Sequence, residues 1–365
     1  MTFVSRERRN TAIRALAIGV ALPFGASQLA AQYPLSPSPV VNINRVQSKP
    51  HFSGYVSVRG VRSNDSTTLS VNRGRVTVVT APLPYLAVRL QGDVSGRLRS
   101  DGTTSSFTLT DAYIELAPPS PSRSPSISAS PSPSRRPTSW LEPLHPVLAV
   151  GQFKQPFSLE YLTSFAQLRT ADRSLAVDQL SPKRDIGVMG EVGWRRYFRI
   201  MGAVSNGEGP NATANPDHAQ LVMGRATLSP WPGFAVGMKL ANQSADHMSG
   251  YDARLLWRML ILEGEVIHRS RPAPGTGTVD ARGGYLLAAV KVLPWLEPVY
   301  KWERYEEETG TAGTSIHTHA AWNTVGLNIL SPNESLRVQL DWIARAERPQ
   351  HVPNNEFLAQ VIANF

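Results

Sequence analysis

The segment LRVQLDWIA, residues 336–344, decides the fold. Apolar side chains occupy every second position along it: Leu336, Val338, Leu340, Trp342 and Ala344. The positions between them begin with three polar residues: Arg337, Gln339 and Asp341. A period of two is typical of a β-strand with one apolar and one polar face.

The same alternation recurs along the chain, for example over residues 86–98 and 234–240. Sixteen such segments can be placed, while helical periodicity is almost absent. Their approximate centres are residues 57, 76, 91, 111, 149, 189, 201, 224, 238, 254, 265, 288, 301, 326, 340 and 360. An even number of half-apolar strands predicts an all-β fold, a transmembrane antiparallel β-barrel. No segment after the first thirty residues has the roughly 18 consecutive apolar residues that a membrane-spanning helix needs.

The connections between these segments alternate in length. Tight turns are expected at four places: 194–196, 229–233, 293–295 and 331–334. Longer polar loops are expected between them: 206–217, 243–250, 270–282, 306–319 and 346–355. Short turns at one end and long loops at the other are typical of outer-membrane barrels, with the turns facing the periplasm. The longest loop, residues 154–184, follows the fifth strand.

The two ends of the chain indicate export to the outer membrane. Residues 1–31 combine four arginines, a short apolar run and small residues before a cut after Ala31, as a signal peptide does. Residues 32–50 form a flexible lead-in, and 51–365 form the barrel. The last strand alternates and ends on Phe365, which resembles the signal that outer-membrane proteins present to the barrel assembly machinery. Outer-membrane lipid is therefore an expected partner.

A Pro/Ser-rich tract at residues 118–139 interrupts the barrel pattern. Its composition cannot bury a core, so we expect a disordered insertion in place of a periplasmic turn.

Composition narrows the function. The formal net charge is +9, and removal of the signal leaves 33 bases against 27 acids, or +6. A basic balance favours anionic partners. There is no cysteine, so disulfides and thiolate sites are excluded. No serine-hydrolase elbow, zinc-protease helix or phosphate loop occurs, which argues against an enzyme. His317 and His319 are more simply explained as exposed residues than as metal ligands.

Three short motifs carry a family resemblance. They are GQFKQPFSLEYLTS at 151–164, DRSL at 172–175 and PKRDIGVMGEVG at 182–193. Together they resemble the phosphate-selective porin O and P family. The resemblance covers roughly 60 residues and implies that the 154–184 loop folds into the lumen and narrows a pore. The Pro/Ser-rich tract and the chain after residue 240 depart from the family pattern.

Candidate site residues follow from the loop and from the alternation. The loop contributes five cations to the expected substrate path: Lys154, Arg169, Arg173, Lys183 and Arg184. The lumen wall contributes five more: Arg89, Arg97, Arg225, Lys239 and Arg337. Rings of Arg or Lys select anions, and guanidinium groups bind phosphate bidentately. The same groups also brace a barrel by pairing with carboxylates, and this interpretation stays open.

The leading hypothesis is a porin that lets small anions, among them phosphate, diffuse passively through a water-filled pore. Neither a cofactor nor a nucleic-acid partner is expected, and a homotrimer is a candidate assembly. The alternatives are a plugged structural or adhesive outer-membrane barrel and, more remotely, a secreted soluble β-sandwich or propeller.

Overall fold

The computed structural model describes residues 37–40, 48–63, 66–96, 106–118, 144–273, 277–311, 314–349 and 354–365. Within these ranges the chain forms sixteen strands, and each of the sixteen expected centres lies in one of them. The strands are β1 His51–Arg62, β2 Thr67–Leu83, β3 Leu86–Gly96, β4 Ser106–Leu116, β5 Leu144–Lys154, β6 Arg184–Trp194, β7 Phe198–Ser205, β8 Leu221–Leu228, β9 Phe234–Gln243, β10 Asp246–Trp257, β11 Leu260–Pro272, β12 Thr278–Val290, β13 Leu296–Thr311, β14 Thr314–Leu330, β15 Leu336–Arg348 and β16 Glu356–Asn364.

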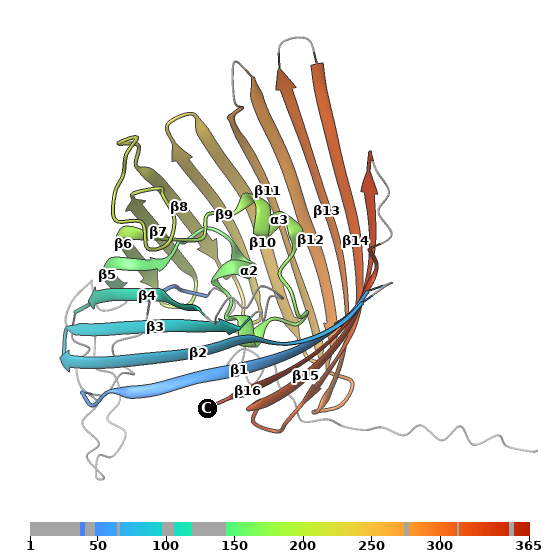
Figure 1. Ribbon diagram of the computed structural model, residues 1–365. Coiled ribbons are helices and arrows are strands. Elements are labelled where there is room, and N and C mark those ends of the chain that lie inside the picture. Colours follow the sequence, from blue (N-terminus) through green and yellow to red (C-terminus); the bar gives the residue numbers. More distant parts are fainter. Residues whose placement is uncertain are drawn as a thin grey trace, which may run out of the picture.

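The strands form one closed antiparallel barrel in which sequence neighbours pair and β1 pairs with β16 (Figure 1). The all-β barrel prediction is confirmed. The last residue completes the closure, because Phe365 and Gly54 exchange two backbone hydrogen bonds of 3.0 and 2.9 Å. The Phe365 ring lies where a side chain on Gly54 would have to be, so glycine at this position lets the terminal aromatic ring cover the seam.

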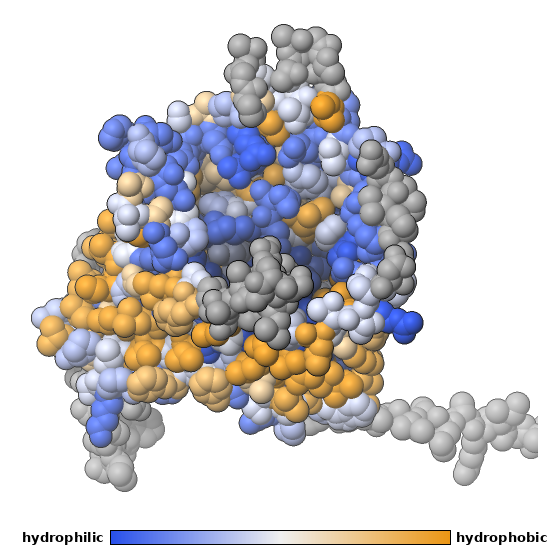
Figure 2. Space-filling model, viewed as in Figure 1, coloured by the Kyte–Doolittle hydropathy of each residue, from blue (hydrophilic) through white to orange (hydrophobic). Residues whose placement is uncertain are grey.

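Alternation places apolar side chains outside and charged ones inside. On β9, Met238 and Leu240 are 49% and 58% exposed, whereas Lys239 between them is 1% exposed and lies in the interior. Figure 2 shows the result as a hydrophobic outer wall, a hydrophilic upper rim and a hydrophilic hollow. Such an outer wall matches lipid, and the interior retains water and charge.

The expected loops at 243–250, 270–282 and 306–319 were wrong. The β9–β10 connection is a tight turn between Gln243 and Asp246, and β11, β12, β13 and β14 continue far into the other two segments. Cross-strand ion pairs hold these polar hairpins together. Arg269 pairs with Asp246 at 2.5 Å and Arg282 with Glu306 at 2.6 Å. Charge pairs across a ladder stabilise strands whose composition resembles that of a loop.

Some expected segments lie outside the described residues: the signal peptide at 1–31, part of the lead-in at 32–50, and the Pro/Ser-rich tract at 118–139 except Pro118. The described chain resumes at Leu144, and β4 and β5 pair up to Leu116 and Leu148.

The segment between β5 and β6, Gln155–Lys183, folds inside the barrel as expected (Figure 1). It contains the helices α2 (Leu159–Leu162) and α3 (Leu175–Leu180) and the 3-10 turn η2 (Phe165–Gln167). The hydroxyls of Ser158 and Ser174 cap the two helices by accepting backbone N–H bonds. Among the described residues, no helix is long and apolar enough to cross a membrane.

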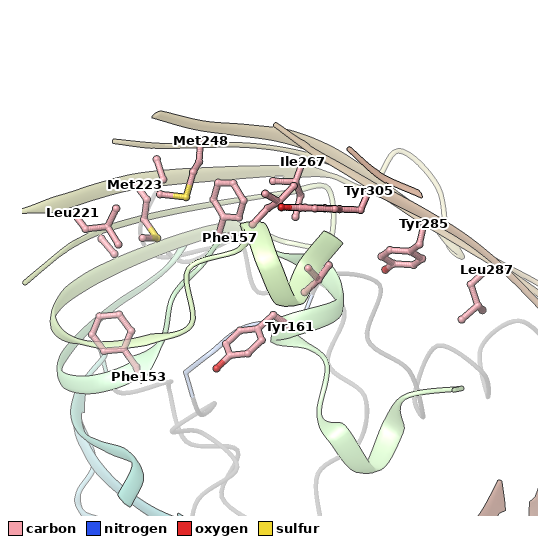
Figure 3. Close-up of a cluster of buried hydrophobic side chains, with 14 of the residues drawn as sticks. Phe153, Phe157, Tyr161, Leu221, Met223, Met248, Ile267, Tyr285, Leu287 and Tyr305 are labelled. Atoms are coloured by element: carbon pink, nitrogen blue, oxygen red, sulfur yellow. The ribbon is translucent and has the colours of Figure 1, made fainter. Parts of the chain in front are cut away.

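An apolar patch on the inner wall receives this loop. Loop residues Phe157, Tyr161 and Val177 pack with wall residues that alternation places inward: Leu221, Met223, Met248, Ile267 and Tyr285 (Figure 3). Phe157 and Val177 are fully buried. Burial of one large apolar side chain contributes about 1.5–3 kcal/mol, so this patch explains why the loop folds inward instead of extending into solvent.

Ion pairs at one end of the loop join it to β8–β11. Arg225 pairs with Asp252 at 2.6 Å and donates to the carbonyl of Phe157 at 2.7 Å. Lys239 pairs with Asp252 and Glu265, and Glu265 accepts hydrogen bonds from the Ser158 hydroxyl and the Glu160 N–H.

The middle of the loop is attached to the opposite wall. Arg169 makes two contacts of 2.8 and 2.9 Å with Glu297 of β13. Arg337 of β15 donates to the carbonyl of Leu168 at 2.6 Å. Arg59 of β1 completes the attachment by pairing with Asp172 at 2.8 Å. The loop is thereby held from strands on several sides of the lumen.

The first prediction concerns Gly151, which has a φ of 132° and packs its Cα against β4. A methyl group there would meet the Ala112 carbonyl and lie 2.8 Å from the Tyr113 Cα. Gly151→Ala should therefore cost about 1–3 kcal/mol. The control is Gly190→Ala, because a methyl group at Gly190 would meet no atom within 4 Å. This variant should change the free energy of unfolding by less than about 0.5 kcal/mol. Urea unfolding in detergent micelles measures both, and equal losses would contradict the prediction.

The second prediction concerns the loop anchor. Arg169→Ala leaves the Glu297 side chain, 0% exposed, without its ionic partner and should cost about 3–5 kcal/mol. The double variant Arg169→Met with Glu297→Leu should recover most of the loss, because no buried charge remains. Arg282→Ala serves as the control, since that side chain is 75% exposed and its pair should contribute less than about 1 kcal/mol. A double variant no more stable than Arg169→Ala would contradict this account.

Candidate functional site

The candidate site is a group of cations around Tyr161 of α2. Four lie near its ring: Arg173 at 4.9 Å, Lys183 at 5.2 Å, Lys154 at 5.5 Å and Arg184 at 5.9 Å from the centroid. The negative face of an aromatic ring attracts cations at such distances. The ring therefore helps to gather positive charges that would otherwise repel one another.

Guanidinium groups from β2 and β3 extend this group along the wall. Arg184 and Arg89 share Asp111, at 2.7 and 3.0 Å. Two further arginines of β2 share Asp93 of β3: Arg75 at 2.5 Å and Arg73 at 3.5 Å. We call the whole set the basic cluster, and its members are Arg73, Arg75, Arg89, Lys154, Arg173, Lys183 and Arg184.

The basic cluster carries an excess of positive charge. Among the described residues, three carboxylates form ion pairs with its seven cations: Asp93, Asp111 and Asp178. The difference is a formal charge of +4. Where water is partly excluded, such an excess acts on a passing ion more strongly than it would in bulk water.

The members differ in exposure and so in role. The side chains of Lys183, Arg73 and Arg89 are 34%, 28% and 24% exposed. Lys154 is buried, and its Nζ donates to the carbonyls of Tyr161, Leu162 and Thr163 at 2.8–3.2 Å. Lys154 thus supplies hydrogen bonds to carbonyl groups at the end of α2, which lack partners within the helix. The partly exposed side chains of Lys183, Arg73 and Arg89 can meet a solute.

The remaining expected site residues lie elsewhere. Arg169, Arg225, Lys239 and Arg337 are buried in the anchors of the loop, each in an ion pair with a carboxylate. Arg97 lies outside the described residues. Of the ten expected cations, the structure thus gathers Arg89, Lys154, Arg173, Lys183 and Arg184 in the basic cluster and uses four others to hold the loop.

Glu160 lies between the basic cluster and the anchors. It accepts a hydrogen bond of 2.8 Å from the Ser174 N–H and lies 3.9 Å from Lys301. Burial raises the pKa of this carboxyl to about 7, because loss of water disfavours its charged form, and Lys301 offsets only part of the effect. Glu160 therefore changes charge close to neutral pH, next to Arg173 and Lys183.

A small cavity of about 20 Å³ separates the loop from β10–β12. Glu160, Thr163, Arg254 and Glu263 are among its lining residues. This volume is enough for about one water molecule, and the polar lining can hold it. The cavity is therefore a small pocket beside the loop and is not the pore.

Sequence reasoning missed Arg73 because of a β-bulge. Leu69 and Val71 point outward, and strict alternation would place Arg73 outward as well. The register of β2 against β3 shifts between Val71 and Gly74, which turns Arg73 toward Asp93. A bulge inserts one residue and reverses the faces beyond it. Gly74, at the edge of the shift, is the signal that could have located it, because a glycine inside a strand often marks a bulge.

The histidine and acid pairs seen in the sequence stay at the rim. His317 lies 3.6 Å from Glu308, and His319 lies 3.8 Å from Glu306. Within the described ranges no group of three or more potential ligands is arranged to hold a metal ion.

The family described as Phosphate-selective porin O and P matches residues 147–248, from within β5 to within β10, including the whole inward loop. No curated protein matches the chain significantly.

Solved structures resemble the barrel at low sequence identity. OmpF of Salmonella typhi, in complex with daunomycin, is 10% identical with a TM-score of 0.62, covering 90% of this chain and 100% of that one. The anion-selective porin from Comamonas acidovorans is 11% identical with a TM-score of 0.60, covering 87% and 99%. The trimer form of OmpT of Vibrio cholerae is 10% identical with a TM-score of 0.57, covering 87% and 99%.

The structural likeness concerns the fold, a closed sixteen-stranded barrel, and the family match adds the loop inside it. The chain therefore has the fold of an outer-membrane porin, and its residues 147–248 match the phosphate-selective porin O and P family.

Proposed function

We propose that the chain is an outer-membrane porin that lets small anions diffuse passively through a water-filled pore and that the basic cluster is its filter. The observation that supports the proposal is the asymmetry of charge around the loop. The anchors on β8–β15 pair each cation with a carboxylate, whereas the basic cluster has an excess of four positive charges. An anion beside the cluster replaces water and offsets this excess.

Phosphate is a fitting substrate for chemical reasons. A guanidinium group presents parallel N–H donors that match two phosphate oxygens. Arg73 and Arg89 share their carboxylates with Arg75 and Arg184, so neither is fully neutralised. The family description names phosphate, and one similar fold is named as anion-selective. Both agree with a filter built on these arginines.

We also propose the remaining properties expected of such a porin. A signal peptide at residues 1–31 would be removed on export, and the Pro/Ser-rich tract would lie in the periplasm. The Phe365 strand would be recognised by the barrel assembly machinery, and the outer wall would face lipid. The trimer form of the similar OmpT fold favours a homotrimer.

A second candidate is a plugged structural or adhesive barrel. The observation that favours it is the number of attachments of the loop, to β1 as well as to β8–β15. Planar-bilayer conductance separates the two candidates, because a plugged barrel carries no steady ion current.

The third prediction tests the filter. The triple variant Arg73→Gln, Arg89→Gln, Lys183→Gln removes three exposed charges and leaves Asp93 and Asp111 paired with Arg75 and Arg184. The anion-over-cation permeability ratio should fall about tenfold, because each charge acts on a nearby ion with about 0.5–1 kcal/mol in a water-like medium. Reversal potentials in a salt gradient measure the ratio, and block of chloride current by phosphate should weaken.

The matched control for the filter removes three charges at the outer rim: Arg271→Gln, Arg282→Gln and Arg304→Gln. These side chains are 44%, 75% and 53% exposed, and charges in open solvent are screened beyond about 8 Å at physiological salt. The control should leave selectivity nearly unchanged. Equal effects of the two triple variants would show that the basic cluster is not the filter.

The fourth prediction concerns pH. A carboxyl with a raised pKa is neutral below that value, so Glu160, with a pKa of about 7, should be uncharged at pH 5.5 and charged at pH 8.5. With chloride as the permeant anion, anion selectivity should be higher at pH 5.5. Glu160→Gln should reduce this difference and give the high selectivity at both values. Asp178→Asn, a 52% exposed acid on the same loop, should retain the difference. A pH response identical in wild type and Glu160→Gln would contradict the assignment.

A further inference from the structure

Residues Pro37–Val40 lie inside the barrel although they precede the first strand. Pro37 is buried, and Ser38, Pro39 and Val40 are half-buried. Val40 packs against the interior apolar cluster that also holds Phe157 and Tyr161 of the loop. Figure 1 shows this short blue piece within the barrel, beneath α2.

Two inward side chains of the wall hold this piece. The Tyr113 hydroxyl of β4 donates a hydrogen bond of 2.9 Å to the carbonyl of Pro39. The Ser38 hydroxyl donates to the carboxylate of Glu191 on β6. Tyr113 and Glu191 are 3% and 8% exposed. Both partners are therefore largely withdrawn from the lumen.

The contacts place the piece between the level of the basic cluster and the periplasmic end of the lumen. Tyr113 pairs across the sheet with Gly151, just before the loop begins after Lys154. Glu191 lies three residues before Trp194, where β6 ends at a turn, or about 10 Å along the strand. Short turns of such barrels face the periplasm. Tyr113 also pairs across the sheet with Arg89, so a solute at this end of the basic cluster meets the piece on its way to the periplasm.

The piece also covers a negative charge. The Glu191 carboxylate pairs with Arg199 at 3.0 Å through one oxygen and accepts the Ser38 hydroxyl through the other. Both oxygens are thus engaged. An uncovered carboxylate at this level would oppose the passage of anions.

We propose that Pro37–Val40 is a lumenal strap, a second restriction in series with the loop, which narrows the pore between the basic cluster and the periplasm and shields Glu191. The strap rests on the proposed function, because a restriction in series has an effect only in a conducting pore. It sets how fast ions leave the filter, whereas the basic cluster sets which ions enter.

The chain contains no cysteine, so a single introduced thiol reports its own surroundings. Val40→Cys places the thiol on the strap. Ser48→Cys is the matched control on the same lead-in, at an exposed residue whose carbonyl accepts a hydrogen bond from Thr80. Both variants are treated with a small sulfonated thiosulfonate reagent during single-channel recording, and mass spectrometry verifies the modification.

Modification of the thiol at position 40 should lower the single-channel current, because the added sulfonate lies in the ion path, and modification at position 48 should not. A second variant lacks residues 32–47 and should show a conductance about 1.5-fold or more above wild type, because a restriction in series is removed. Complete modification of the Val40→Cys variant without a change in current would overturn the strap, as would unchanged conductance of an assembled deletion variant.

The same recordings separate failure of the strap from failure of the proposed function. A wild-type chain without ion current would overturn the anion pore itself. If the deletion variant then conducts, the strap stands as the element that closes the lumen. If the deletion variant carries no ion current either, the strap is overturned too. If the deletion variant does not assemble, the recording on the Val40→Cys variant decides.

Discussion

Every backbone N–H and C=O group in the hydrocarbon of a membrane needs a partner within the protein, and the closed strand ladder meets this requirement. The closure depends on the last pair, in which Phe365 and Gly54 join the ends of the barrel. Once the ladder is closed, each strand has one face in lipid and one in water. Apolar residues such as Leu240 must then face outward and charged residues such as Lys239 inward. The interior therefore collects charge, and the remaining structure determines how that charge is balanced.

The balance of positive and negative charges differs between the two sides of the inward loop. Where the loop is packed against β8–β15, water is excluded, and a buried charge without a partner would cost several kcal/mol. The cations there, such as Arg169 and Arg225, accordingly have carboxylate partners. On β2–β6 the loop leaves side chains partly in water, so an excess of positive charge is tolerated, with Tyr161 beneath it. The cost of an unpaired charge thus explains both roles. It is high where water is excluded, so the cations there are paired and hold the loop, and it is low where water remains, so unpaired cations can serve as a filter.

Much of the fold could be predicted because a strand's pattern is local. The sixteen strands follow from residues close together in the chain, whereas the inward course of the loop after Lys154 was implied by the family resemblance. The extents of the rim hairpins could not be predicted, since pairs such as Arg269–Asp246 stabilise a ladder in segments whose composition is that of a loop. The bulge in β2 reversed the face of Arg73 for a similar reason, because register depends on the neighbouring strand.

The sequence by itself determined where the sixteen strands are centred, that their alternate positions are apolar, and that the loop carries five cations. Only the tertiary structure decided what each cation does. Arg169 and Arg173 lie four residues apart, yet Arg169 meets Glu297 on a distant strand and holds the loop, whereas Arg173 meets Tyr161 and joins the basic cluster. Strand pattern depends on neighbours in the chain, while the role of a charge depends on partners in space and on the water left around it. No local pattern encodes that environment.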